Sequence, residues 1–442
     1  MRSKKLSVGS NLSLAMFALT ILTTSNLAVA QTESVLHSFS YNQKDGFHPV
    51  GNLVLDAAGN LYGTAGYGGE NASCYVTGEG CGSVFELTPK TGGGWVEKVL
   101  HNFGGGKDGA NPWAGVIFDG AGNLFGTTVN GGANNKGVVF ELSPVSGGGW
   151  TEKIIHSFGA GIDGYGPTGS LVFDAAGNLY GTAEYGGAFG AGGNGGTVFE
   201  LTPKTGGGWS EKILHSFGHG HDGFTPASNV IFDAAGNLYG TTYYGGLSST
   251  SCNPDVHVSC GTVFELTPTS SGPWTETILH SFGNYGTDGN FPYGGLIFDA
   301  SGNLYGTTTG GGNSTSCTSA VGCGVVFELT PATGGGWTET VLHNYNGNST
   351  DGSSPDDSLI FDALGNLYGT TGGDGAHGGG TVFKLTPAGG GVWTETLLHS
   401  FGLGHDGLYP NSGLVFDSVG NLYGATIQGG ATGSGTVFEV TP

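Results

Sequence analysis

The chain has 442 residues, with 12 Lys and Arg against 34 Asp and Glu, and a net charge of −22. Nucleic acids and anionic membranes are bound through basic stripes and guanidinium groups, and Arg2 is the only arginine. The charge therefore argues against both as partners. An acidic surface is compatible with divalent cations, with neutral glycans or simply with solubility.

Residues 1–30 have the pattern of a secretory signal. Three basic residues lie within the first five, an apolar segment follows around Leu12 to Leu22, and Ala28-Val29-Ala30 precedes Gln31. The apolar segment is far shorter than the roughly 20 residues that span a bilayer, which favours a cleaved signal over a retained anchor. Losing three basic residues and no acidic one would change the net charge from −22 to −25. We therefore expect export, no membrane insertion, and a single mature domain at residues 31–442.

One unit of about 60 residues occurs seven times after residue 35. The copy at residues 170–217 contains four runs of β-branched and aromatic residues, separated by turn residues such as D-x-x-G-N and G-G-G. The strands expected from these runs are Leu171–Phe173, Leu179–Thr182, Thr197–Leu201 and Trp209–Phe217. Four antiparallel strands per repeat are typical of one blade of a β-propeller.

The two ends of the sequence complement each other. The last copy stops after its third strand, near Val437, whereas the segment after Gln31 aligns with the fourth strand of the other copies. A split blade would close the ring and remove the unpaired edges that an open array exposes. An open solenoid would need polar capping repeats, and none is visible in the sequence. The sequence thus predicts an all-β, seven-bladed β-propeller whose last blade is closed by the N-terminal strand.

Three recurring blocks, F-D-x-x-G-N-L-Y-G-T-T, G-T-V-F-E-L-T-P and W-T-E-x-x-L-H-S-F, resemble the GloVer tandem repeat of secreted bacterial proteins. That family is described as carrying a choice of C-terminal anchors. The resemblance covers essentially the whole mature chain and implies export and a propeller-like array, but it transfers no activity and no catalytic residue. The sequence reaches Pro442 without a hydrophobic tail, which favours free secretion or periplasmic residence over anchoring.

Strand alternation sorts the connections into two faces. The loops between the first and second strands and between the third and fourth strands are nearly constant, whereas the other two sets of loops vary, so a specific site is expected on the variable face. All six cysteines lie there as local pairs, and disulfides suit an exported protein better than a zinc site, whose cysteines are usually closer together. The expected pairs, which would stiffen the loops, are Cys74 with Cys81, Cys252 with Cys260, and Cys317 with Cys323.

Several polar residues recur in every copy. An aspartate precedes glycine in each connection between copies, and another begins each D-x-x-G-N turn; both are expected to cap turns, because calcium needs 6–8 oxygens. Calcium binding nevertheless remains an open alternative. The repeated histidines are interpreted as packing and hydrogen-bonding elements between blades rather than as a ring of ligands, and they are His37, His101, His156, His215, His280, His343 and His399.

Residues that break the repetition are the candidates for specific binding. Histidines next to carboxylates could hold a transition metal, as in Asp255 with His257 and Asp374 with His377, but they are dispersed, so no metal site is assigned. Aromatic residues on the same face, which also include Tyr285 and Tyr409, could stack on sugars. The candidate ligand face consists of Tyr67, Trp113, Tyr185, His219, His221, Asp222, Tyr243, Tyr244, His405 and Asp406.

Two functions fit these features. One is an exported, monomeric, non-catalytic protein that acts as a scaffold or binds a glycan, a cell-envelope component or a protein, with no cofactor. The other is an extracellular polysaccharide lyase or glycosidase, since propellers host both. Asp356 and Asp357 are the adjacent acids on the variable face, but neighbours in a strand point apart, so no catalytic residue is assigned and binding is favoured. A purely structural role is a third possibility.

Overall fold

The computed structural model describes residues 32–41, 45–70, 74, 80–190, 195–247, 260–270, 272–283, 288–314, 317 and 322–442. The segment assigned to a secretory signal lies outside these residues. Residues 31–442 form one compact unit. No helix in the described part of the chain is long and apolar enough to cross a membrane.

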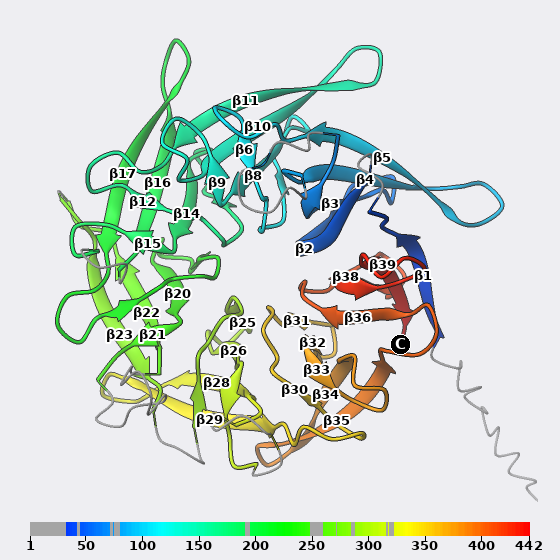
Figure 1. Cartoon of the computed structure of the whole chain (residues 1–442). Helices are drawn as coiled ribbons and strands as arrows, with labels where there is room; N and C mark the ends of the chain where they lie inside the picture. Colours follow the sequence, from blue (N-terminus) through cyan, green and yellow to red (C-terminus); the bar gives the residue numbers. More distant parts are fainter. Residues whose placement is uncertain are drawn as a thin grey trace, which may run out of the picture. The chain divides into compact units, whose positions relative to one another are not determined.

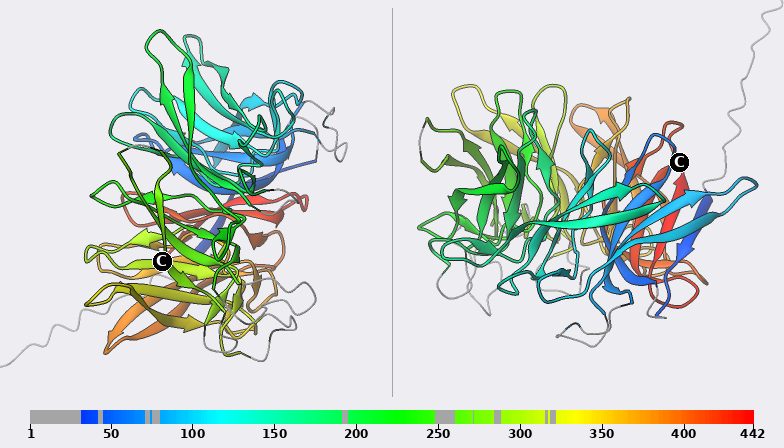
Figure 2. Two further views of the ribbon diagram at one scale, coloured as in Figure 1. Left: turned by 90° about the vertical axis from the view of Figure 1, so that its left-hand side faces the viewer. Right: turned by 90° about the horizontal axis from the view of Figure 1, so that it is seen from above.

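The unit is a ring of seven antiparallel sheets, the blades of a β-propeller (Figure 1). Seen from the side, the blades stand next to one another with loops at both ends (Figure 2). Each blade runs from an innermost strand near the ring axis to an outermost strand, in chain order except for the last blade. The predicted fold class is therefore confirmed.

The inner half of each blade holds its first two strands. The innermost strands are β2 (Gly46–Leu55), β7 (Ile117–Phe118), β13 (Val172–Phe173), β19 (Ile231–Phe232), β25 (Ile297–Phe298), β31 (Ile360–Phe361) and β37 (Val415–Phe416). The second strands are β3 (Leu61–Gly68), β8 (Leu124–Thr128), β14 (Leu179–Ala183), β20 (Leu238–Thr242), β26 (Leu304–Thr308), β32 (Leu367–Thr371) and β38 (Leu422–Gly429).

The outer half of each blade holds the longer strands. The third strands are β4 (Ser83–Pro89), β10 (Val138–Val145), β16 (Thr197–Pro203), β22 (Thr262–Thr267), β28 (Val325–Pro331), β34 (Thr381–Gly389) and β39 (Thr436–Thr441). The outermost strands are β5 (Trp95–Asn102), β11 (Gly149–Ser157), β17 (Trp209–Ser216), β23 (Thr275–Ser281), β29 (Trp337–Asn344), β35 (Val392–Ser400) and β1 (Thr32–Ser38).

The ring closes through the N-terminal strand, as the sequence predicts. Strand β1 pairs with β39 in an antiparallel ladder that runs from Thr32 opposite Thr441 to Ser38 opposite Thr436. The last blade therefore has the order β1, β39, β38, with β36 (Gly407–Pro410) and β37 both paired to β38. Because its outermost strand comes from the other end of the chain, this blade joins the two ends of the repeat array.

The innermost strand differs from the single short run expected from the sequence. It is divided into two pieces in blades 2 to 7. In blades 2 to 6 the earlier piece pairs with an extension of the second strand, and in the last blade it pairs with β38 itself. A positive φ followed by proline separates the pieces, because proline lacks the N–H that a ladder needs. The extra pairs are β6 (Gly109–Ala110) with β9 (Asn130–Gly131), β12 (Gly164–Tyr165) with β15 (Tyr185–Gly186), β18 (Gly223–Phe224) with β21 (Tyr244–Gly245), β24 (Gly289–Asn290) with β27 (Gly310–Gly311), and β30 (Gly352–Ser353) with β33 (Gly373–Asp374).

The core lies between blades rather than within them. At the interface, or seam, between blades 2 and 3, Phe158 from the end of blade 2 and Phe199 from blade 3 are both fully buried, with their rings edge to face at 5.1 Å. The repeated tryptophan also crosses a seam, since Trp209 lies edge to face against Phe125 of the preceding blade. Equivalent contacts recur around the ring, so each blade is stable only next to its neighbours.

Candidate functional site

A pocket lies on the ring axis, and all seven blades contribute to it. Its lining residues come from the three positions that follow a proline in each blade. These segments read Pro-Val-Gly-Asn, Pro-Trp-Ala-Gly, Pro-Thr-Gly-Ser, Pro-Ala-Ser-Asn, Pro-Tyr-Gly-Gly, Pro-Asp-Asp-Ser and Pro-Asn-Ser-Gly in chain order. The cavity has a volume of about 80 Å³, which is room for several water molecules or one compact polar group.

The residue before each proline brings the chain to the axis. In six blades it is not glycine, and yet its φ lies between 52° and 63°. Each of these residues is fixed by a hydrogen bond from its backbone N–H to the preceding blade, as from Ser354 to the carbonyl of Cys323 at 2.7 Å. Left-handed backbone at residues other than glycine is uncommon and gathers at functional sites. The six are His48, Asn111, Thr225, Phe291, Ser354 and Tyr409, and Gly166 occupies the seventh position.

Blade 6 is the blade that places acids at the axial positions. Asp356 and Asp357 both line the pocket, although the regular alternation of a strand would direct neighbouring side chains to opposite faces. They follow Pro355 in the break of the innermost strand, where the alternation of a regular strand does not apply. The side chain of Asn411 donates to Asp356 Oδ2 at 3.0 Å. Asp356 Oδ1 and Asp357 Oδ2 are buried and have no hydrogen-bond partner among the described residues.

Burial changes the protonation of both carboxyl groups. It raises the pKa of Asp356 to about 7, although the hydrogen bond from Asn411 opposes the shift. It also raises the pKa of Asp357 far above its usual range, and the negative charge of Asp356 adds to this. Two adjacent carboxyls in a confined site cannot both ionise easily. The pocket therefore holds at least one proton near neutral pH and can both donate and accept hydrogen bonds.

The backbone around the acid pair is closely packed. A Cβ on Gly294 would lie 2.5 Å from the carbonyl oxygen of Asp357, which explains the Gly-Gly sequence in the neighbouring blade. That carbonyl accepts a hydrogen bond from Thr307 Oγ1 at 3.0 Å, and Gly295 N donates to Ser358 Oγ at 3.0 Å. Contacts from blade 5 thus fix the position of the acidic segment of blade 6.

Aromatic side chains surround the acid pair on one side. Tyr293 lines the pocket, and burial together with the nearby carboxylates raises the pKa of its hydroxyl well above the ordinary value. Tyr243 stacks on Phe291 at 5.1 Å and contacts the edge of Tyr293 at 5.8 Å. Trp113 also lines the pocket and is 41 % exposed. The wall of the pocket therefore offers one exposed ring and a packed cluster behind it.

The expected ligand face is only partly gathered here. Trp113 lines the axial pocket, and Tyr243 packs behind Tyr293. Other aromatic candidates stack within their own blades, namely Tyr67 on Phe47, Tyr185 on Tyr165 and Tyr244 on Phe224. The exposed histidines His219, His221 and His405 do not line the axial pocket. Of the remaining candidates, Asp255, His257 and Tyr285 lie outside the described residues.

Asp222 and Asp406 belong to the seams between blades rather than to a ligand face. Each is bound by a repeated histidine, His215 Nε2 at 3.1 Å and His399 Nε2 at 2.9 Å. The aspartates of this set also cap the turns that contain them, as Gly104 N and Gly109 N donate to Asp108. The aspartates of the D-x-x-G-N turns are capping residues too, since Asp233 accepts from the backbone of Ala235 and Asn237. The turn-capping expectation is confirmed for these residues.

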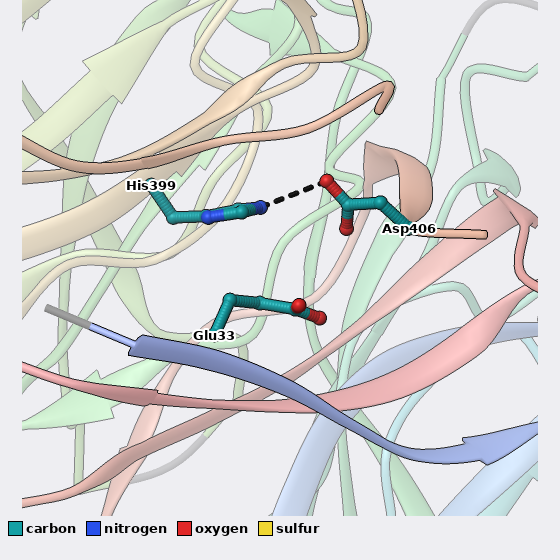
Figure 3. Close-up of side chains that lie close together, drawn as sticks. All are labelled: Glu33, His399 and Asp406. Atoms are coloured by element: carbon teal, nitrogen blue, oxygen red, sulfur yellow. Dashed lines mark hydrogen bonds and ion pairs between the residues drawn. The ribbon is translucent and has the colours of Figure 1, made fainter. Parts of the chain in front are cut away.

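A glutamate from the next blade completes each seam, and it was not foreseen from the sequence. Figure 3 shows Glu33 of β1 facing His399 and Asp406. The sequence does contain a pattern that marks this glutamate, because it recurs two residues after the position of the repeated tryptophan. Burial, followed by the charge of the nearby aspartate, raises the pKa of Glu33 and Glu97 to about 7. The pKa values of the corresponding glutamates at the other seams rise in the same direction.

Two of the expected disulfides are present, Cys74–Cys81 and Cys317–Cys323. Cys260 is also disulfide-bonded, and its expected partner Cys252 lies outside the described residues. The carbonyl groups of Cys81, Cys260 and Cys323 accept the hydrogen bonds from the left-handed residues of the following blades. The disulfide loops therefore support the backbone that lines the axial pocket.

The profile of the Gloeobacter/Verrucomicrobia repeat matches this sequence in three overlapping ranges, residues 22–253, 73–316 and 249–442. The chain belongs to the Gloeobacter/Verrucomicrobia repeat family. The resemblance read from the recurring blocks is thereby confirmed. No curated protein matches this member of the Gloeobacter/Verrucomicrobia repeat family.

Solved structures with a similar chain course include two dehydrogenase-related proteins. One is the pyranose dehydrogenase PQQ domain from Coprinopsis cinerea, at 13% identity and a TM-score of 0.41 over 93% of this chain and 97% of that one. The other, described as a putative oxidoreductase (glucose dehydrogenase), is from Thermus thermophilus, at 13% identity and a TM-score of 0.37 over 93% of this chain and 100% of that one. Neither likeness bears on the activity of this Gloeobacter/Verrucomicrobia repeat protein.

Proposed function

We propose that this protein is an exported, monomeric binding protein that receives part of a glycan in its axial pocket. The observation that supports this is the Asp356–Asp357 pair, which stands at one of seven otherwise neutral axial segments and has one carboxyl oxygen on each residue without a partner among the described residues. Carboxyl groups and the amide of Asn411 can exchange hydrogen bonds with sugar hydroxyls. The exposed ring of Trp113 offers an apolar face for a sugar ring.

The size of the cavity limits what enters it. A volume of about 80 Å³ suits a terminal residue or a compact branch, while the remainder of a larger glycan would lie across the variable face. The two disulfides agree with an extracellular or periplasmic location. The net charge of −22 favours a neutral or cationic ligand over an anionic one.

A glycan array of the full chain tests the proposal. Saturable binding to a set of related glycans is expected, and Asp357→Asn is expected to weaken it at least about tenfold, which corresponds to about 1.4 kcal/mol. Glu70→Gln is the matched control, because it removes one acid from an exposed position that does not line the pocket. Equal loss in both variants, or no saturable binding, would contradict the proposal.

A glycosidase or lyase is the second candidate, and the raised pKa of Asp356 favours it. A carboxyl group that titrates near pH 7 beside a second acid is suited to general acid catalysis. Turnover of cell-wall or plant polysaccharides by the full chain, abolished by Asp356→Asn with binding retained, would establish the enzyme. Binding without turnover in the same assay would favour the non-catalytic protein.

A further inference from the structure

The seams between blades repeat one cluster of three ionisable side chains. The histidine lies on the outermost strand of one blade, and the aspartate lies in the turn that follows this strand. The glutamate lies on the outermost strand of the next blade. In at least five of the clusters that the structure describes, the potential ligand atoms all lie within 4.8 Å of one another. These clusters are His101 with Asp108 and Glu152, His156 with Asp163 and Glu211, His215 with Asp222 and Glu276, His280 with Asp288 and Glu339, and His399 with Asp406 and Glu33.

The backbone of the outermost strand directs each histidine into the seam. In blade 3, Val198 lies opposite His215 and Phe199 opposite Ile213, so a bulge occurs at the residue between them. The same register shift recurs in the outermost ladder of every blade. A bulge turns the following side chain to a new direction. The ring of His215 is then held edge to face against Phe217 at 4.6 Å.

The distances within a cluster match the spacing of ligands around a small metal ion. His156 Nε2 lies 3.1 Å from Asp163 Oδ2 and 3.5 Å from Glu211 Oε1. At the neighbouring seam the two distances from His101 Nε2 are 3.5 and 3.6 Å. Ligands about 2.0–2.1 Å from a tetrahedral ion lie about 3.3–3.4 Å from one another. The three side chains therefore need little movement to share one ion.

Some carboxylate oxygens of these clusters have no hydrogen-bond partner among the described residues. The side chain of Asp163 is only 4% exposed, and its Oδ1 is buried without a partner among the described residues. Glu211 Oε1, which faces His156, is also buried and unpartnered. Two buried carboxylates require a positive charge or a proton beside them. The ion pairs of these carboxylates in the described part of the chain are all with histidine, not with lysine.

The seam before the last blade has a direct route from solvent. A surface recess there is lined by Glu33, His399 and Asp406, and also by His377 and His405. Figure 3 shows the carboxylate of Glu33, on the N-terminal strand β1, facing the same space as His399 and Asp406. A ligand at this point would connect blade 6 to the strand that closes the ring.

We propose that the seam clusters bind divalent transition-metal ions such as Zn²⁺, and that the site at Glu33, His399 and Asp406 is the most accessible one. One imidazole nitrogen with two carboxylate oxygens suits zinc and its neighbours, whereas calcium takes 6–8 oxygen ligands. A bound ion would join adjacent blades and, at this seam, would lock the two ends of the repeat array together. The competing occupant of each cluster is a proton.

Metal titration of the full chain tests this proposal. Protein treated with a chelator is titrated with Zn²⁺, and bound metal and the Tm are measured at one fixed pH. We expect more than one Zn²⁺ per chain and a rise in Tm with added metal. Bound Co²⁺ should give the visible absorption of a site with a nitrogen ligand. Absence of tight Zn²⁺ binding, with an unchanged Tm, would show that protons alone fill the clusters and would overturn the proposal.

Two variants locate the most accessible site. His399→Gln is expected to lower the amount of bound Zn²⁺ by about one ion per chain, and Glu33→Gln, which keeps the shape of the side chain, is expected to do the same. His219→Gln is the control, because this histidine is exposed and belongs to no seam cluster. If all three variants bind as much Zn²⁺ as the unmodified chain, or lose it equally, the assignment is wrong.

Discussion

The axis and the seams of this ring are built from the same repeat, but the residues at the seams are nearly constant from blade to blade, whereas the residues at the axis vary. At every seam the chain repeats one chemistry, a histidine facing an aspartate, with a glutamate arriving from the next blade. At the axis the three residues after proline change from blade to blade, and acids occur in blade 6 alone. A feature present in all blades serves the ring as a whole, whereas a feature present once can be specific for a ligand.

Both regions contain buried carboxylate oxygens that have no hydrogen-bond partner among the described residues, Asp163 Oδ1 at a seam and Asp356 Oδ1 at the axis, but the other partners of these carboxylates differ. Seam aspartates are bound by backbone N–H groups and by histidine, as Asp163 is by Gly159 N and His156. At the axis, Asp356 accepts a hydrogen bond from Asn411, while one oxygen of each axial carboxyl is buried and has no partner in the part of the chain that the structure describes. Unpartnered buried oxygens are costly, which is the physical reason to expect that a ligand meets them.

Deletion of residues 32–38 is expected to have the largest effect on the seams. The deletion takes away β1, leaves β39 without its outer neighbour, and removes Glu33 and His37 from the two seams that flank the last blade. We expect loss of cooperative folding, measured by thermal unfolding and size-exclusion chromatography. A chain that begins at residue 32 is the control. A cooperative transition of the deleted chain within about 5 °C of that control would show that ring closure contributes little.

Substitution of two aromatic residues beside the axis distinguishes a contribution to stability from a contribution to glycan binding. Tyr243→Ala is expected to destabilise the protein by about 2–4 kcal/mol, because the ring stacks on Phe291 and contacts Tyr293. Trp113→Ala should cost about 1 kcal/mol or less, since the side chain is 41 % exposed, yet weaken glycan binding. Denaturant unfolding and array binding of both variants measure the two effects. The reverse order of stabilities would place Trp113 in the core and Tyr243 on the binding surface.

The pH dependence of the Tm tests whether the buried carboxyl group of Asp356 at the axis is protonated in the folded protein. The pKa of Asp356 is raised in the folded protein to about 7, so folding favours its protonated form. This stability is fully present below the unfolded pKa, near 4, and is lost as the pH rises through about 7. Asp356→Asn removes this pH-dependent contribution to stability. Between pH 5 and pH 8 the Tm of the variant should therefore fall by about 2–4 °C less than the Tm of the unmodified chain.

The seam groups are the same in both proteins, so their contributions cancel in this comparison, which is measured by calorimetry. An identical fall in Tm for the two proteins would show that Asp356 is ionised without penalty and would remove the physical reason for a ligand in the pocket.

The smallest expected effect concerns the constant face. In blade 4, Tyr239 OH donates to Asp233 Oδ2 at 3.2 Å, whereas blade 2 has Phe125 at this position. Tyr239→Phe should destabilise the protein by about 0.5–1.5 kcal/mol, and Phe125→Tyr should leave stability unchanged or raise it slightly. Denaturant midpoints of both variants give the answer. A larger loss in Tyr239→Phe than in Tyr243→Ala would contradict the view that the constant face only caps turns.

Much of the fold could be predicted from the sequence because the repeat states it seven times. The four runs of apolar residues, the turn glycines and the complementary ends determine the blades and their closure, and the local cysteine pairs determine two disulfides. The break in the innermost strand was not foreseen. It depends on a left-handed residue before proline, as at Thr225, whose backbone is held by a bond from the preceding blade.

The candidate site was harder to predict for the same reason. Regular strand alternation predicts that Asp356 and Asp357 lie on opposite faces, whereas both residues line the pocket where the innermost strand is broken. The seam clusters join residues of two blades that are far apart in the sequence, by 51 positions for His101 and Glu152 and by 366 for Glu33 and His399, and no local pattern shows that they meet. The sequence shows that the histidine, aspartate and glutamate each recur in every copy. That the three meet in one cluster follows only from the arrangement of the blades in a ring.

One calorimetric titration compares the two regions directly. The oligosaccharide that gives the strongest array signal is titrated into the unmodified chain, the Asp356→Asn/Asp357→Asn double variant and the seam variant His399→Gln. The account predicts that the double variant loses binding at least about tenfold while its fold is retained, and that His399→Gln binds the oligosaccharide as the unmodified chain does. Loss of binding in His399→Gln with full binding in the double variant would contradict it.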